Sequence, residues 1–379
     1  MTIDNPFLVN TYISPQLFCD REAETATITG ALRNGRNVLL FSPRRYGKTG
    51  LIRHAFDQLA RKRGTCTVFA DIYAADDAHE FNVILLNAVH EALNPNPKLF
   101  LKNAMEWFAS LRPVVQYDEL SGQPSISLER SKHRKEAATT REIFRILQAQ
   151  KRPVFLAIDE FQQVAGFPDV RMDAVLRTEL QRSPNVHCIF SGSQRHILQD
   201  LFSNAAKPFF GSADQMELGR IDRDVYADFA CRMMKRHKRS LAREDALFCY
   251  DQCNGHTYYV QVLFNRLFGD ARALDRSTIV DVMRSIIHEQ DAIMATLRSA
   301  LTKGQWDLFA AISREGEVDT PTGAEFIRKH QLSSSAALVQ ALKALLDREL
   351  VYVIDHRADS GKPVYAAYNP FHGAWFKYR

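Results

Sequence analysis

Val38-Leu-Leu-Phe-Ser-Pro-Arg-Arg-Tyr-Gly-Lys-Thr-Gly50 is the stretch of this 379-residue sequence that decides the fold. Its apolar start, residues 38–41, is typical of a parallel strand that is covered on both faces. Gly47 permits a tight turn whose N–H groups point at one anion, Lys48 would reach the β- and γ-phosphates of a nucleotide, and the Thr49 hydroxyl would bind Mg²⁺. Apolar residues at helical spacing follow, so a helix N-terminus would add its positive dipole end to the site. The stretch predicts a phosphate-binding loop between a strand and a helix.

One position departs from the usual pattern G-x-x-x-x-G-K-[ST]. Its first glycine is replaced by Ser42, and serine lacks the access of glycine to positive φ. Taken alone, the stretch therefore leaves a second interpretation open, an ordinary strand-to-helix turn that happens to contain Gly-Lys-Thr. The motifs that accompany a phosphate loop must decide between the two.

The first accompanying motif is Lys151-Arg-Pro-Val-Phe-Leu-Ala-Ile-Asp-Glu160. Five apolar residues end in an acidic pair at the carboxyl end of a predicted parallel strand, where open α/β sheets bind their ligands. Asp159 is placed to hold Mg²⁺, and Glu160 to orient or deprotonate an attacking water. Strands that end in Asp-Glu are common, but one that follows Gly-Lys-Thr in this order indicates a nucleotide site.

A third predicted strand, Val186-His-Cys-Ile-Phe-Ser191, runs into Gly-Ser-Gln. Its position after the acidic strand is that of a strand whose terminal polar side chain touches the γ-phosphate or the attacking water. Ser193 is the first candidate for this role and Gln194 the second. A simple helix N-cap by Ser191 or Ser193 is an equally open interpretation, which does not exclude the first.

Composition sets broad limits on function. A hydrophobic share of 46% and a charged share of 25% are ordinary for globular proteins, and a formal charge of +5 permits nucleic-acid binding without arguing for it. No apolar run approaches the roughly 20 residues of a membrane helix, and the N-terminus has no pattern of a secretory signal. The six cysteines form no C-x-x-C pair, which favours buried thiols in a reducing cytosol. We therefore expect a cytoplasmic protein without a membrane partner.

The periodicity divides the chain into three predicted domains. Residues 1–218 would form the α/β core, with helices at 22–32 and 79–110, strands at 65–72 and 214–218, and a β-hairpin inserted at about 113–128. Residues 219–298 are helical and include the basic run Lys235-Arg-His-Lys-Arg239. Residues 299–379 contain three predicted helices followed by two strands, the pattern of a winged helix-turn-helix.

Six motifs in this order resemble those of the archaeal-type ATPases, which are AAA+-related P-loop ATPases of the STAND group. They are Phe18-Cys-Asp-Arg-Glu, Ser-Pro-Arg-Arg-Tyr-Gly-Lys-Thr-Gly-Leu, Leu-Ala-Ile-Asp-Glu-Phe-Gln, Phe-Ser-Gly-Ser, Asn-Gly-His-Thr-Tyr-Tyr and Tyr368-Asn-Pro-Phe-His-Gly-Ala-Trp375. The resemblance covers nearly the whole chain. It implies an AAA+-like parallel sheet core, a helical lid, a C-terminal winged helix, and the use of ATP and Mg²⁺.

The resemblance also assigns residues. Lys48 and Thr49 match the Walker A pair, Asp159 and Glu160 the Walker B pair, and Ser193 the sensor 1 position. The loop residues expected to hold the nucleotide are Ser42, Pro43, Arg44, Arg45, Tyr46, Gly47, Lys48, Thr49 and Gly50. His256 falls in the lid segment near the nucleotide base, although Thr257 stands where the family often has proline. Lys207 falls where a neighbouring subunit often supplies a cationic finger, a role usually taken by arginine.

Three functions remain open at this point. The first is a slow ATPase that acts as a switch, in which nucleotide closes the lid and the winged helix serves a protein client, with nucleotide-dependent oligomers. The second is a DNA-associated ATPase whose predicted duplex contacts are Gln340 and Lys343 on the helix at 335–346 and Arg357 and Lys362 on the wing. The third is a module that binds nucleotide without hydrolysing it, against which the intact Asp159-Glu160 pair argues.

Overall fold

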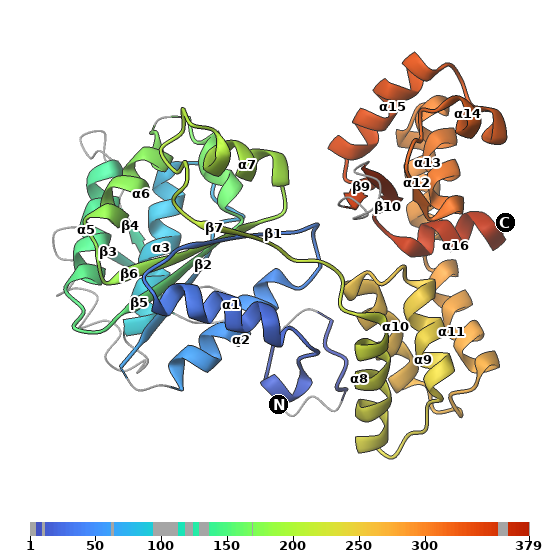
Figure 1. Ribbon diagram of the computed structural model, residues 1–379, viewed down its shortest axis with the longest axis horizontal. Helices are drawn as coiled ribbons and strands as arrows, with labels where there is room; N and C mark the ends of the chain where they lie inside the picture. The colour runs from blue at the N-terminus through green and yellow to red at the C-terminus, as the bar shows by residue number, and fades with distance from the viewer. Residues whose placement is uncertain are drawn as a thin grey trace. The chain divides into compact units, whose positions relative to one another are not determined.

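The protein was analysed as a computed structural model that describes residues 5–9, 12–61, 64–93, 113–117, 124–128, 136–168, 170–354 and 363–378. Its chain forms two compact units (Figure 1). One is Tyr12–Gly219, and the other is Arg220–Arg379 together with the N-terminal segment. Phe7 of that segment stacks on Phe264 with 5.3 Å between ring centres, and Asn5 donates to the carbonyl oxygen of Asn265. The second unit thus includes residues from both ends of the chain.

The Tyr12–Gly219 unit is built on a five-stranded parallel sheet. The strands are β1 (Val38–Phe41), β2 (Cys66–Asp71), β5 (Val154–Asp159), β6 (Val186–Gly192) and β7 (Asp214–Glu217), in the order β2-β5-β6-β1-β7. All five were predicted, with bounds that differ by a few residues at most. The strand order places β6 between the strand that enters the phosphate loop and the strand that ends in the acidic pair. Three polar strand ends therefore meet at one edge of the sheet.

Helices cover both faces of this sheet (Figure 1). Helices α1 (Glu22–Arg33) and α2 (Lys48–Ala60) pack with the Val38 and Leu40 side of β1. Helices α3 (Ala78–Leu93), α5 (Glu136–Gln148), α6 (Met172–Gln181) and α7 (Arg195–Ser203) lie on the opposite side, which carries Leu39 and Phe41. Alternate residues of β1 thus enter two different cores, which explains why the strand reads as a continuous apolar run.

The predicted β-hairpin is present as β3 (Pro113–Tyr117) and β4 (Pro124–Leu128), which pair antiparallel. The helix predicted over 79–110 is described as α3, and residues 94–110 lie outside the described residues.

The second unit begins with a series of helices and continues into a winged part that contains antiparallel strands. Its helices are α8 (Arg223–Arg236), α9 (Arg243–Gln252), α10 (Thr257–Gly269), α11 (Arg276–His288), α12 (Asp291–Ala300), α13 (Lys303–Glu315), α14 (Ala324–His330) and α15 (Ser335–Asp347). Side chains fix several starts: Asp222 caps α8, Asp275 caps α11, and Thr302 forms a capping box with Gln305 at α13. Strands β9 (Val351–Ile354) and β10 (Val364–Ala367) pair antiparallel as the predicted wing.

Two elements of the winged part were not predicted. Strand β8 (Glu317–Val318) pairs with β10 and extends the wing to three strands, and helix α16 (Pro370–Tyr378) follows the wing. Helix α16 packs on α13, where Trp306 and Phe376 have ring centres 5.2 Å apart. Within the part of the chain that the structure describes, no helix is both long and apolar enough to cross a membrane.

Candidate nucleotide-binding site

The phosphate loop turns between β1 and α2 with two residues in the left-handed region. Gly47, at φ 96°, immediately precedes the first residue of α2, and Arg45 has φ 64°. Ser42 is not among the described residues with positive φ. Its hydroxyl donates to the carbonyl oxygen of Pro43 at 2.9 Å. The serine in place of the first glycine therefore imposes no left-handed strain, which removes the main physical objection to this loop.

Lys48 is buried although it carries a charge. Its side chain bends back over the loop, so that Nζ lies 3.2 Å from the carbonyl oxygen of Ser42 and 3.4 Å from that of Pro43. The residue is only 6% exposed. A buried ammonium is stable only where oxygen atoms surround it. The loop thus keeps one cation at the N-terminus of α2, where backbone N–H groups and the helix dipole also favour an anion.

Asp159, at the end of β5, is the centre of a hydrogen-bond network. Its Oδ2 accepts from Thr49 Oγ1 at 2.7 Å, and its Oδ1 accepts from Ser191 Oγ at 2.6 Å and from the Glu160 N–H at 3.1 Å. Carboxylate and hydroxyl oxygens are the protein ligands that Mg²⁺ prefers. Because the structure brings Thr49 and Asp159 into direct contact, this donor set fits the ion that the sequence predicted.

Glu160 is held beside this network in a left-handed conformation, φ 57°. Its Oε2 accepts from Ser193 Oγ at 3.2 Å and from Gln162 Nε2. Arg44 approaches from the phosphate loop, with Nε 3.5 Å from Ser193 Oγ and the guanidinium carbon 5.6 Å from the centre of the Tyr73 ring. A cation, a hydroxyl and a carboxylate from three segments of the chain are thus brought together.

The helix-cap interpretation of the two serines is wrong. The N-cap of α7 is Gln194, and no side chain caps this helix, since both hydroxyls are directed to the acidic pair. Sequence reasoning did not place Ser191 in the candidate site, because its contact with Asp159 depends on β6 lying between β1 and β5. The signal that could have identified Ser191 was a hydroxyl side chain near the carboxyl end of a predicted strand.

A third carboxylate also escaped the sequence analysis. Asp71 ends β2 and stands opposite Asp159 in the parallel register. Partial burial raises its pKa, and the charges of Asp159 and Glu160 raise it further, against the lowering effect of the Tyr73 N–H that donates to Asp71 Oδ1. The side chain retains contact with solvent. Negative charge therefore gathers along this edge of the sheet, as expected where a cation binds.

The other predicted residues of the loop lie at its surface or beneath it. Arg45 is exposed and Tyr46 is buried, and the ring of Phe18 lies close to Gly50 on the first turn of α2. Lys207 follows α7, and its Nζ pairs with Asp200 Oδ2 at 3.2 Å. Its role as a finger toward a second subunit stays a prediction.

Predicted residues of the second unit lie in different surroundings. His256 precedes α10 and is 1% exposed, with its ring centre 4.8 Å from that of Tyr259 and 5.8 Å from that of Tyr368. Its contact with a nucleotide base stays a prediction. Gln340 and Lys343 are exposed on α15, while Arg357 and Lys362 lie outside the described residues.

Comparison with known proteins supports the fold. Residues 292–378 match a family model described as a probable winged helix domain. No curated protein matches the sequence. The Walker-type ATPase PABY2304 of Pyrococcus abyssi is similar in structure, with a TM-score of 0.65 and 16% identity over 98% of this chain and 99% of that chain.

Two further solved structures come from Aeropyrum pernix. The ORC2 protein, in ADPNP–ADP complexes, gives a TM-score of 0.60 and 11% identity over 99% of this chain and 97% of that one. The ORC1 protein in complex with DNA gives a TM-score of 0.55 and 10% identity over 99% of this chain and 96% of that chain. The fold is therefore that of P-loop ATPases, a parallel sheet core followed by a helical segment and a C-terminal winged helix. Membership of the STAND group stays a prediction.

Proposed function

We propose that this protein binds and slowly hydrolyses Mg-ATP and works as a molecular switch, in which the nucleotide state changes the arrangement of the helical segment and the winged helix. One observation carries the proposal: Thr49, Asp159 and Ser191 form a continuous hydrogen-bond network that lies next to the Glu160–Ser193–Arg44 contacts. A binding set and a catalytic set thus occupy one edge of the sheet.

The residues divide the work by their chemistry. Lys48 and the N–H groups at the start of α2 would hold the phosphates, and Thr49 and Asp159 would hold Mg²⁺, which supplies charge neutralisation on the phosphate oxygens when bound. Glu160 would orient a water and accept its proton, with Ser193 fixing the carboxylate. In this proposal the protein accelerates hydrolysis by positioning the reactants and by stabilising the charge that develops on the phosphate oxygens.

The proposal extends to the domain boundaries and partners expected from the sequence. We take residues 1–218 as the ATPase core, apart from the N-terminal segment that packs with the second unit, 219–298 as the helical lid and 299–379 as the winged helix. The winged helix would act on a protein client in a nucleotide-dependent assembly. Limited proteolysis with and without ATP would test the rearrangement, since a switch predicts different cleavage patterns in the two states. Identical patterns at saturating ATP would contradict it.

Two substitutions test the ATPase itself. Glu160→Gln should leave ATP binding intact and reduce turnover by about 10²-fold or more, while Lys48→Ala should weaken binding and turnover together. Glu91→Gln, an exposed carboxylate on α3, is the matched control and should change neither. Unchanged hydrolysis in the Glu160→Gln protein would refute the role of Glu160, and absence of ATP binding by the unaltered protein would refute the proposal.

DNA binding by the winged helix is the second candidate function. It is favoured by the match to a winged helix model and by a structural neighbour that was solved with DNA. Against it, the exposed face of α15 offers one cation, with the residues Ser335, Ala336, Ala337, Val339, Gln340, Lys343 and Asp347. Duplex readers usually present more positive charge. Loss of duplex binding in a Gln340→Ala, Lys343→Glu variant would support this function.

A further inference from the structure

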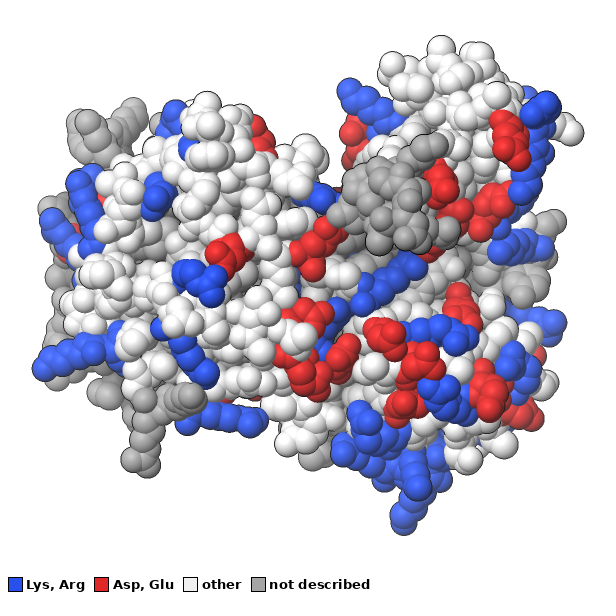
Figure 2. Space-filling view, in the orientation of Figure 1, with Lys and Arg blue, Asp and Glu red and all other residues white. Residues whose placement is uncertain are grey.

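The C-terminal end of α8 carries a group of cations that the proposed function does not use. Arg232, Lys235, Arg236 and Lys238 are all exposed, and together we call them the α8 basic end. Figure 2 shows Lys and Arg side chains gathered where α8 ends in Figure 1. The first three are three or four residues apart, so they share one side of the helix. Lys238 follows the helix in a left-handed conformation, φ 60°.

Most of the remaining arginines of this helical segment are compensated. Seven of them pair with carboxylates: Arg220 with Glu317, Arg223 with Asp251, Arg243 with Asp224 and Asp228, Arg266 with Glu289, Arg272 with Asp270 and Asp281, Arg276 with Asp245, and Arg284 with Asp281. In the same described region, no carboxylate pairs with any member of the α8 basic end. Apart from Arg298, whose guanidinium lies over the Trp306 ring, the exposed arginines and lysines of this segment that lack a carboxylate partner are thus concentrated at the end of α8.

Arg239, the last residue of the basic run, fixes this place in the fold. Its guanidinium donates to the carbonyl oxygens of Leu267, Phe268 and Arg272. The end of α8 is therefore anchored to the C-terminal end of α10 and to the loop that follows it. The four cations next to it stand on a fixed support, which lowers the entropy cost of binding.

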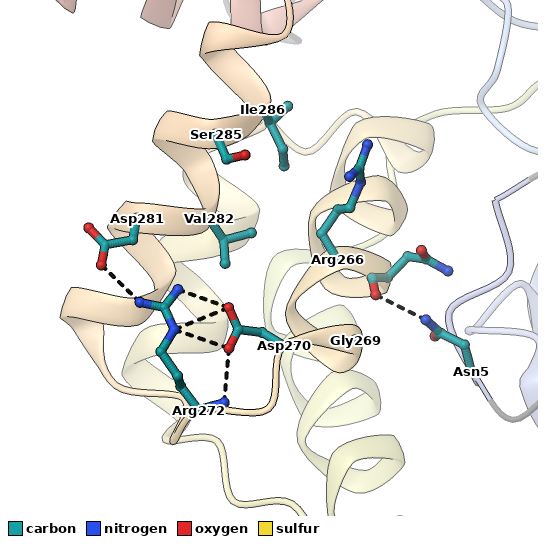
Figure 3. A pocket seen from close by; sticks show the side chains of 10 residues that line it. Asn5, Arg266, Gly269, Asp270, Arg272, Asp281, Val282, Ser285 and Ile286 are labelled. Atoms are coloured by element: carbon teal, nitrogen blue, oxygen red, sulfur yellow. Dashed lines mark hydrogen bonds and ion pairs between the residues drawn. The ribbon is translucent and has the colours of Figure 1, made fainter.

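A polar pocket on that same loop is a contrasting case (Figure 3). It encloses about 480 Å³ and includes Arg266 and Arg272 in its lining. Arg272 is engaged by Asp270 and Asp281, and Arg266 pairs with Glu289. Both cations of the pocket are already neutralised, so an anion would gain little there. In the described part of the chain, no carboxylate pairs with the cations of the α8 basic end, so none would compete there with a bound anion.

We propose that the α8 basic end binds the phosphate backbone of double-stranded nucleic acid, independently of base sequence. The chemistry separates this partner from others. Protein interfaces place apolar and aromatic residues at their centre and are poor in lysine, and membrane-bound helices need an apolar face. No large apolar side chain at residues 230–240 is exposed. Exposed lysines and arginines without exposed apolar neighbours are typical of contacts with phosphates.

The helix dipole alone does not account for the arrangement. Cations in the last turn of a helix are stabilised by its negative end, which would explain Lys235 and Arg236. Arg232 precedes that turn, and Lys238 lies beyond the helix. The nearest acidic side chain on α8 itself, Asp228, is engaged by Arg243. The cluster is therefore more extensive than helix stability requires.

The test measures binding of the full-length protein to a fluorescent 30-base-pair duplex of random sequence over a range of salt concentrations. In one variant Arg232, Lys235, Arg236 and Lys238 are each changed to Gln. Each phosphate contact contributes about 0.9 to the magnitude of the slope of log K against log salt, so loss of four contacts should lower that magnitude by up to about 3.6 and the affinity by more than about tenfold. The matched control changes Arg33, Arg61, Arg145 and Lys151, four exposed cations of the first unit, to Gln and should bind like the unaltered protein.

The outcomes separate this inference from the proposed ATPase. ATP turnover should be unchanged in the α8 variant, and binding should be similar for duplexes of different sequence. Equal losses in the α8 variant and its control would overturn the inference, as would a loss that follows Lys343→Glu on α15 and not the α8 changes. Failure to bind duplex while binding anionic vesicles or an acidic peptide would also overturn it. None of the binding results depends on whether the protein hydrolyses ATP.

Discussion

Arg44 Nε lies 3.5 Å from Ser193 Oγ, so the arginine of the phosphate loop reaches the serine that donates to Glu160. If the proposed site binds ATP, the same chain would thereby supply a cation near the γ-phosphate. We expect Arg44→Ala to lower kcat by about 10²-fold, because one donor to the developing charge is lost. Arg44→Lys should recover only part of the rate, since lysine lacks the planar donors of arginine. Steady-state hydrolysis and fluorescent ATP binding, measured side by side, separate kcat from affinity.

The alternative source of a cation at the proposed site is Lys207 of a neighbouring subunit. A finger from a neighbouring subunit predicts a rate per chain that rises with protein concentration and falls in Lys207→Ala. Arg44 acting within its own chain predicts a rate that is independent of concentration and little changed in Lys207→Ala, whose ammonium already pairs with Asp200. A concentration-dependent rate that disappears with Lys207 would reject the role given to Arg44.

Ser191→Ala should raise the Mg²⁺ concentration needed for half-maximal turnover by about tenfold, since partners that orient a metal ligand typically contribute 10- to 100-fold to affinity. The hydroxyl is buried and donates to Asp159 Oδ1 at 2.6 Å, on the opposite oxygen from Thr49. Mg²⁺ titration of ATP turnover measures the effect. Ser193→Ala is the comparison, which should lower kcat and leave the Mg²⁺ requirement unchanged; equal Mg²⁺ curves for the unaltered and Ser191→Ala proteins would exclude the orienting role.

The contrast between these two serines shows what the sequence could predict. The loop at Gly47 and the pair at Asp159 are local signals, because a few adjacent residues carry both the strand and the chemistry. Ser191 belongs to the candidate site only because β6 lies between β1 and β5, and no residue adjacent to Ser191 in the sequence indicates that strand order. The contact of Arg44 with Ser193 joins segments 149 residues apart and was likewise beyond sequence reasoning.

The same distinction applies to the fold. The five parallel strands and the helices of the winged part were predicted because their apolar periodicity extends over whole elements. Strand β8 has two residues, too few for any period, and it exists because β10 offers it a partner. Helix α16 was missed because its aromatic residues, such as Trp375 and Phe376, read equally well as a strand.

Gly192→Ala should disturb the candidate site indirectly, by displacing the Gln162 side chain that contacts Glu160. A methyl group at this position would overlap Gln162 Oε1 and come within 3.1 Å of Leu198 Cδ1. Gln162 is buried and donates to Glu160, so its displacement should move the carboxylate. We expect a stability loss of about 1–3 kcal/mol from overpacking and a lower kcat with ATP binding retained. Urea unfolding and turnover measure the two effects.

A second substitution separates crowding from function in that experiment. Gln162→Ala added to Gly192→Ala should restore stability by making room, without restoring kcat. Gly30→Ala on α1, where nothing lies within 4 Å of the added methyl, should be neutral or stabilising by up to about 1 kcal/mol. Full activity in the Gly192→Ala protein would show that Gln162 does not position Glu160.

His372 should make the Arg220–Arg379 unit sensitive to acid. Burial on α16 lowers its pKa to about 4, from an ordinary value near 6.5. Because the unfolded chain binds the proton more readily, stability is fully present above about pH 6.5 and is lost as pH falls toward 4, by at most about 3 kcal/mol. Urea unfolding followed by Trp306 and Trp375 fluorescence in a Trp107→Phe background should show the decline. His372→Leu should flatten it, whereas His237→Leu, at an exposed position on the same unit, should not; the same slope in all three proteins would assign the acid sensitivity to other groups.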